Sequence, residues 1–143
     1  MIKNERQYKF TRARADEVGV AISELRHASL PVGLSPDMRE LQLEALAGTL
    51  GDFEAELSEY DDLTNATLIE ATGIGEFPRA LIRARIARGL TQRELAERLG
   101  LTEQSIQRYE ATDYLGVSFS RLVEIAEALD LAIHYDVRLV DAN

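Results

Sequence analysis

Residues 81–131 carry the clearest signals of the fold and read LIRARIARGLTQRELAERLGLTEQSIQRYEATDYLGVSFSRLVEIAEALDL. The centre of this stretch predicts two short amphipathic helices joined by a tight turn, in which Gly100 supplies the left-handed residue. Thr91 and Glu94 form a capping box before the first of these helices, and Thr102 caps the second. Because each helix has its own cap, the stretch predicts a helix, a tight turn and a second helix.

Two further helices flank this centre. Pro78 opens one that runs through Ala87 and ends at Gly89, and Ser118 caps another with Arg121 at its third position. Apolar residues at helical spacing predict the buried faces of the four helices: Leu81, Ile82, Ile86, Leu95, Ala96, Leu99, Ile106, Tyr109, Phe119, Leu122, Ile125, Ala126 and Leu129. The arginines of the first of the four are predicted to point outward: Arg79, Arg83, Arg85 and Arg88.

Residues 1–28 predict a long helix at the N-terminus. Asn4, with a glutamine three residues later, resembles a capping box, while Thr11 offers an alternative, later start. Steps of three and four residues give the helix a coiled-coil-like seam: Tyr8, Thr11, Ala15, Val18, Ile22 and Leu25. Pro31 and Gly33 are predicted to break this helix.

A second long helix is predicted to start at Ser35 and Pro36 and to run to about Leu63. Its apolar seam has the same spacing: Leu43, Leu46, Leu50, Phe53, Leu57, Tyr60 and Thr64. The reverse face is acidic: Glu54, Glu56, Glu59, Asp61 and Asp62. The two helices predict an antiparallel hairpin, residues 1–63, which must pack on a copy of itself or on another protein, because it cannot bury both of its faces.

Residues 64–76 predict a linker, with a candidate short strand at 67–69, that joins the hairpin to the four-helix unit of residues 77–131. Residues 132–143 predict a C-terminal strand, because polar residues alternate there with Ile133, Tyr135, Val137 and Leu139. A lone strand is not stable. Its candidate partners are residues 67–70, the same strand of a second chain, and the sheet edge of another protein.

The composition narrows the class of protein. With 45% hydrophobic and 29% charged residues, the chain is globular and not disordered. No apolar run approaches the length of a membrane span, and the start has no signal-peptide core, so we expect no membrane partner and a cytoplasmic location. Because cysteine is absent and His27 and His134 are the only histidines, we expect no metal site, no cofactor and no enzyme.

Charge is unevenly distributed along the chain, whose net charge is −9. Residues 1–75 carry 7 basic and 14 acidic residues, and residues 112–143 carry 2 basic and 6 acidic residues. Residues 76–111 carry 7 basic and 5 acidic residues and are the only net-positive window. Attraction to phosphate depends on this local distribution more than on the total.

Residues 78–131 resemble the phage-repressor-like Cro/XRE family of helix-turn-helix proteins. The pattern R-x-x-R-G-L-T-Q-x-E-L-A-x-x-L-G-L-T-x-x-x-I-x-x-Y-E matches residues 85–110. Four more residues follow at family-like distances: Ser118, Leu122, Ile125 and Ala126. We expect a mainly α fold, with an N-terminal helical hairpin before the bundle and a short C-terminal strand after it. The resemblance implies that the bundle is phage-repressor-like. It also implies that the third helix of the bundle enters the major groove of DNA.

The resemblance implies a set of DNA-contacting residues. Base edges would be met by four side chains of the third helix: Glu103, Gln104, Gln107 and Arg108. Phosphates would be met by Thr102 and Ser105, and Gln92 would anchor a phosphate or a base. Arg93, Arg79 and Arg83 would contact the DNA backbone. Alternatively, Arg93 and Arg98 are solvated surface charges, and each pairs with a glutamate four residues away on the same helix.

The implied function is a sequence-specific DNA-binding transcriptional regulator, a repressor acting as a homodimer on double-stranded DNA. Within this class the acidic hairpin suggests an autoregulating antitoxin whose partner is a basic toxin-like protein. The alternative is a protein-interaction adaptor that uses the fold as a scaffold. Two features favour the adaptor: the chain is acidic overall, and the loop after the third helix has Asp113 where many relatives use a Gly-Lys pair. Glu103 also places a negative charge at the start of the third helix, where phosphate would bind.

Overall fold

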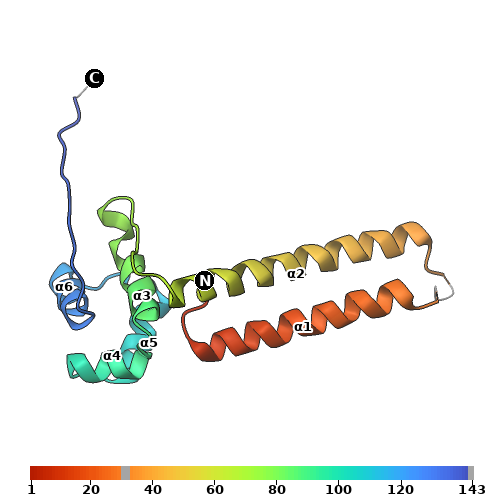
Figure 1. Cartoon of the computed structure of the whole chain (residues 1–143), viewed down its shortest axis with the longest axis horizontal. Coiled ribbons are helices and arrows are strands. Elements are labelled where there is room, and N and C mark those ends of the chain that lie inside the picture. The colour runs from red at the N-terminus through yellow and green to blue at the C-terminus, as the bar shows by residue number, and fades with distance from the viewer. Residues whose placement is uncertain (30–32, 142–143) are drawn as a thin grey trace.

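The computed structural model describes residues 1–29 and 33–141. Within these residues the chain forms a long helical hairpin that projects from a bundle of short helices, and an extended tail leaves the bundle (Figure 1). The elements are α1 (Glu5–His27), α2 (Pro36–Thr64), the short 3-10 helix η1 (Ile74–Glu76), α3 (Phe77–Ala87), α4 (Gln92–Leu99), α5 (Glu103–Ala111) and α6 (Phe119–Ala128). The predicted mainly α fold is confirmed.

Local capping residues fix where the hairpin helices begin. The Asn4 side chain accepts a hydrogen bond from the Gln7 amide at 2.8 Å, and the Gln7 side chain accepts one from the Lys3 amide at 2.8 Å. The Ser35 hydroxyl accepts one from the Met38 amide at 3.2 Å at the start of α2. The first helix therefore starts after Asn4, and the alternative start at Thr11 is wrong because Thr11 lies in the buried seam.

One side of each hairpin helix is buried against the other. Ile2, Ala15 and Leu57 form its core, and the rings of Tyr8 and Tyr60 lie 5.1 Å apart between their centroids. The opposite sides stay in solvent and carry several large apolar residues: Phe10, Val20, Met38 and Leu41. The predicted break at Pro31 lies outside the described residues, while Gly33 adopts a left-handed backbone with φ of 93°.

The bundle of α3 to α6 is held by a compact apolar core. Its fully buried side chains come from all four helices and the turn after them: Leu81, Ile82, Leu95, Ile106, Ile125 and Leu129. Leu63 of α2 is buried in the same core and Tyr60 packs against it, so the hairpin is joined to the bundle. Gly100 ends α4 with φ of 66°, as the turn between α4 and α5 requires.

The capping box of α4 gives a first prediction. The Thr91 hydroxyl accepts from the Glu94 amide at 3.1 Å, and the Glu94 carboxylate accepts from the Thr91 amide at 2.7 Å. Thr91→Ala is expected to lower the free energy of unfolding by about 1 kcal/mol, because the backbone amide of Glu94 loses its acceptor while the Thr91 amide keeps the Glu94 carboxylate. Urea unfolding monitored by circular dichroism measures this, with Thr49→Ala on the exposed side of α2 as the control. An equal loss in both variants would contradict the assigned cap.

Three expectations about strands and core differ from the structure. Residues 67–69 and the described part of 132–143 form no strand, because the backbone of each finds no partner within residues 1–29 and 33–141. Phe119 was expected in the core but is 58% exposed. As the first residue of α6 it lies beside the cap and contacts Phe77, with ring centroids 6.1 Å apart, instead of entering the centre of the bundle.

Candidate nucleic-acid interface

Four polar side chains share the solvent-exposed side of α5. Glu103, Gln104, Gln107 and Arg108 are all exposed, whereas Ile106 on the opposite side is fully buried. Gln107 donates to the Glu103 carboxylate at 3.3 Å, so the acidic start of α5 is partly satisfied within the helix. We call these four residues the reading face. The structure thus brings together the side chains that the sequence assigned to base edges.

The hydroxyls at the start of α5 cap the helix. Thr102 accepts from the Ser105 amide at 3.2 Å, and the two side-chain oxygens lie 2.9 Å apart. Thr102 is exposed, while Ser105 is half-buried. Both residues predicted to contact phosphate therefore lie at the N-terminal end of α5, where backbone amides favour an anion.

A buried ion pair lies directly behind the reading face. Arg85 of α3 donates to Glu110 of α5 through Nε at 2.6 Å and through Nη2 at 2.8 Å, with side-chain exposures of 3% and 1%. Arg85 also donates to the Leu90 carbonyl at 2.7 Å and to the Lys3 carbonyl. The expectation that Arg85 points outward is wrong, because a bidentate carboxylate and two carbonyls replace its water.

Gln92, expected to anchor a phosphate or a base, is buried behind the reading face. Its amide nitrogen donates to the Glu110 carboxylate at 2.8 Å, and its amide oxygen accepts from Asn4 at 3.5 Å. The side chain thus fixes α4 against α5 and against the start of the hairpin. A contact with DNA would require its amide to leave these partners.

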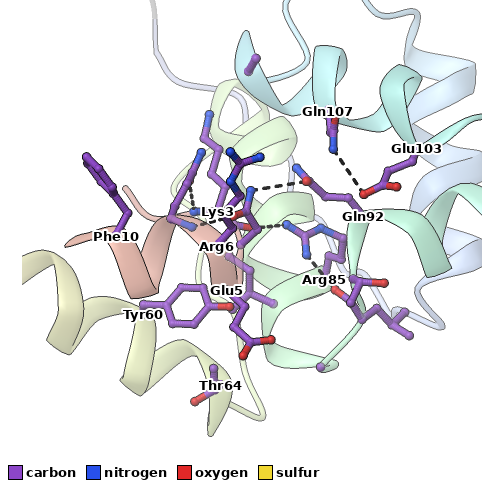
Figure 2. Close-up of a pocket in the computed structure, with 17 residues that line it drawn as sticks. Lys3, Glu5, Arg6, Phe10, Tyr60, Thr64, Arg85, Gln92, Glu103 and Gln107 are labelled. Carbon is purple, nitrogen blue, oxygen red and sulfur yellow. Dashed lines mark hydrogen bonds between the residues drawn. The ribbon is translucent and has the colours of Figure 1, made fainter. Parts of the chain in front are cut away.

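The first residues of the chain lie beside α5, a neighbour that the sequence did not indicate. Lys3 donates to the Glu110 carbonyl and to the Asp113 carboxylate, the latter at 2.9 Å. A groove separates this segment from the reading face: Figure 2 shows Lys3, Arg6 and Phe10 on one side and Glu103 and Gln107 on the other. The start of the hairpin therefore borders the candidate interface.

Asp113 forms ion pairs with two cations. In the sequence alone, its negative charge argued against phosphate binding at this loop. Its carboxylate oxygens lie 2.9 Å from Lys3 Nζ and 3.2 Å from Arg79 Nε. The hydrogen bond from Lys3 lowers the pKa of Asp113 below its ordinary value against the opposing effect of burial, and Arg79 adds to the lowering. The negative charge is thus compensated within the fold and repels phosphate less than the sequence suggested.

This pairing predicts a pH dependence of stability. The pKa of Asp113 is lower in the folded chain than in the unfolded chain. The ionised carboxylate therefore contributes fully to the free energy of unfolding at pH values above its pKa in the unfolded chain, about 3.9. The contribution is lost as the pH falls through the folded value. Urea midpoints measured from pH 5 downward should fall less steeply in Asp113→Asn, and Lys3→Met should flatten the same limb. Curves parallel to that of the wild type would contradict the assignment.

The remaining arginines expected at the DNA backbone have partners in the fold. Arg93 Nε lies 3.0 Å from Glu97, which is the helical pair considered as the alternative. Arg79 pairs with Asp113, and Arg83 Nη1 donates to the Glu70 carbonyl at 3.3 Å. Arg108, in contrast, has no ion-pair partner within residues 1–29 and 33–141. Arg108 is thus the cation of α5 that is available for a ligand.

A metal site and a membrane-spanning helix are two further features that the described residues were able to contain. No group of three or more His, Asp or Glu side chains is arranged to hold a metal ion in the described part of the chain. None of the helices there combines the length and the apolar character that crossing a membrane requires.

The four-helix bundle, with its capped α4, left-handed Gly100 and exposed α5, has the architecture of a helix-turn-helix domain. Comparison with known families agrees: the model described as Helix-turn-helix matches residues 81–135. This part of the chain is a helix-turn-helix domain of the Cro/XRE type, as its sequence predicted.

Two curated proteins are similar to the same region. An uncharacterised HTH-type transcriptional regulator of Rickettsia conorii is 47% identical over 51 residues, which are 36% of this chain and 40% of that protein. A second, from Rickettsia prowazekii, is also 47% identical over 51 residues, which are 36% of this chain and 38% of that protein. The chain thus spans about 40% of the length of these relatives. No solved structure matches the chain significantly.

Proposed function

We propose that the protein is a sequence-specific DNA-binding transcriptional regulator that acts as a repressor. The observation that carries the proposal is the reading face of α5, whose exposed amides and guanidinium stand on a helix fixed from behind by the Arg85–Glu110 pair. An amide can bind adenine through two hydrogen bonds, a guanidinium can bind guanine in the same way, and a carboxylate can accept from cytosine. Thr102 and Ser105 would bind phosphate at the start of α5, and Arg93 would contact the backbone after leaving Glu97.

The proposal includes a homodimer. One reading helix spans only part of a site, and two related by a two-fold axis read half-sites about 34 Å apart on one side of the duplex. Selection of binding duplexes from a random pool tests both parts. We expect enrichment of one sequence with two inverted half-sites about 10 base pairs apart. A pool that remains random would contradict specific recognition, and enrichment of an unrepeated half-site would contradict the dimer.

A finer role within this proposal is that of an autoregulating antitoxin. α2 carries exposed carboxylates that suit a basic toxin-like protein, of which Asp61 also accepts a hydrogen bond from Tyr8 of α1: Glu54, Glu56, Glu59, Asp61 and Asp62. Co-purification with the product of the neighbouring gene tests this role. We expect a basic protein that dissociates as salt is raised, because screened charges hold the complex. The absence of such a partner would leave a repressor without the antitoxin role.

One observation favours the alternative hypothesis that the protein is a protein-interaction adaptor. The hairpin leaves Phe10, Val20, Met38 and Leu41 at least half exposed, with exposures of 67%, 56%, 51% and 67%. Exposed apolar side chains of this size can mark a protein-binding surface. A purified chain that binds a protein through the hairpin but retards no DNA would favour the adaptor over the regulator.

A further inference from the structure

The tail of the chain is extended and unusually exposed for its sequence. Residues 132–141 leave the bundle after α6 and run away from it (Figure 1). Val137, Leu139 and Val140 are 90%, 98% and 90% exposed. β-branched and apolar residues in an extended segment suit a strand, yet the backbone of this one pairs with nothing in the described part of the chain. Its amides and carbonyls thus form an open strand edge.

One end of this tail is attached to the bundle. The ring of Tyr135 meets that of Phe77 edge to face, with centroids 6.0 Å apart, and Phe77 also contacts the half-exposed Phe119. Since side chains alternate along an extended chain, Ile133, Val137 and Leu139 lie on the same side of the tail as Tyr135. The apolar side of the tail therefore starts on the aromatic cluster of Phe77, Phe119 and Tyr135 and continues into solvent.

We propose that the tail pairs, antiparallel, with the tail of a second copy of this chain, about a two-fold axis at Val137. This inference deepens the proposed function, because it names the segment that joins the two copies of a dimeric regulator. The pairing turns both open edges into a two-stranded ribbon and satisfies backbone groups that the single chain leaves to water.

Charge selects the register. With the axis at Val137, Asp136 of each copy lies opposite Arg138 of the other, so the ribbon contains two cross-strand ion pairs. An axis at Asp136 places two aspartates opposite each other, and an axis at Arg138 places two arginines opposite each other. Like charges directly opposite are destabilising. Among these neighbouring registers, only the one at Val137 is complementary in charge.

The same register continues the apolar side of the tail. Leu139 of the second copy lies opposite Tyr135, which is itself in contact with Phe77. The most exposed leucine of each tail thus comes next to the aromatic cluster of the other copy. An isolated two-stranded ribbon is marginal in water, and packing of one of its sides on a helical domain is what stabilises it.

Cysteine cross-linking tests the register directly, because the chain has no cysteine of its own. In Val137→Cys the two sulfurs meet on the axis, with Cα atoms about 4.5–5.5 Å apart, within disulfide range. In Leu139→Cys the two residues are displaced by four positions, roughly 13 Å along the ribbon. After mild oxidation we expect at least about tenfold more covalent dimer from Val137→Cys than from Leu139→Cys. Equal yields, or a preference for Asp136→Cys or Arg138→Cys, would overturn the register.

A charge exchange tests the same claim without cysteine. Asp136→Arg places arginine opposite Arg138 twice in the dimer and is expected to weaken self-association by about tenfold in sedimentation equilibrium. The double variant Asp136→Arg and Arg138→Asp restores complementary pairs and is expected to restore the wild-type association constant. A wild-type chain that stays monomeric at all concentrations, or a double variant as weak as the single one, would overturn the proposal.

Both measurements are made without DNA, so they separate this inference from the proposed function. A protein that selects a DNA sequence but shows no cross-link at position 137 contradicts the interface alone. A protein that cross-links at position 137 but binds no DNA contradicts the regulator and supports the interface.

Discussion

Glu110→Ala is expected to lower the free energy of unfolding by about 3–5 kcal/mol, because it leaves the Arg85 guanidinium buried without its carboxylate. The same change removes the acceptor of the Gln92 amide. A loss of this size is a large part of the 5–15 kcal/mol that stabilises a typical domain. Urea unfolding monitored by circular dichroism measures it, and Glu110→Gln, which retains an acceptor oxygen, provides a milder variant should the alanine variant not fold.

The matched control is another Arg–Glu pair of the same bundle. Arg93 and Glu97 lie 3.0 Å apart with side-chain exposures of 74% and 63%. Glu97→Ala is therefore expected to change the free energy of unfolding by less than about 0.5 kcal/mol. Replacing both buried partners, by Arg85→Met with Glu110→Leu, should cost less than Glu110→Ala, since no charge is left unpaired. Similar losses for Glu110→Ala and Glu97→Ala would show that burial of the Arg85–Glu110 pair contributes nothing.

Arg108→Ala is expected to weaken binding to a selected DNA duplex by about 5- to 150-fold, the equivalent of losing one bidentate base contact. The side chain is exposed on the reading face and has no ion-pair partner in the described part of the chain, so the fold should remain intact. Fluorescence anisotropy with the selected duplex and with a scrambled one measures the effect. The affinity for the selected duplex should fall more than the affinity for the scrambled one, because the contact reads a base.

One control and a second test variant accompany Arg108→Ala. Arg121→Ala removes a guanidinium that belongs to α6 and not to α5 and that pairs with Glu124 at 2.6 Å. It should leave the preference for the selected duplex unchanged. Gln104→Ala removes a second side chain of the reading face and should behave like Arg108→Ala. If binding by the Arg108 and Gln104 variants matches that of the wild type, α5 does not read the DNA.

The sequence predicted most of the helix-turn-helix domain because its signals are local. The caps at Thr91, Thr102 and Ser118 and the left-handed residue Gly100 each act within four residues of themselves. The hairpin was predictable for the same reason, since its seam repeats along each helix. The side chains assigned to base edges were placed correctly on the exposed side of α5, because buried Ile106 fixes which side that is.

The sequence did not predict the buried contacts behind the reading face, because these contacts join residues that are far apart in the chain. Arg85 follows Leu81 and Ile82 by four and three residues, and Glu110 follows Ile106 by four, so both lie in line with apolar stripes. The opposite charges of Arg85 and Glu110, each in line with an apolar stripe, could have indicated a buried ion pair. No comparable signal linked Lys3 and Asn4 to residues about 90 to 110 positions away. Those contacts follow from how the hairpin docks on the bundle.

The predicted strands show the limit of alternation as a signal. Alternation in residues 132–143 describes which side of an extended segment is apolar, but a strand also requires a second backbone within hydrogen-bond distance. The tail is extended as expected, and the pairing that would make it a strand is absent from residues 1–29 and 33–141. A second copy supplies that backbone in the dimer that we propose.

We propose that α5 reads DNA sequence, and the preference of the wild-type chain for its selected duplex tests this claim. The affinity of the wild-type chain is measured for its selected duplex and for a scrambled duplex of equal length across a salt series. At physiological salt the selected duplex should bind about 10³-fold or more tightly than the scrambled one, and both affinities should fall as salt rises. Equal affinity for the two duplexes, or no binding at low salt, would contradict the claim.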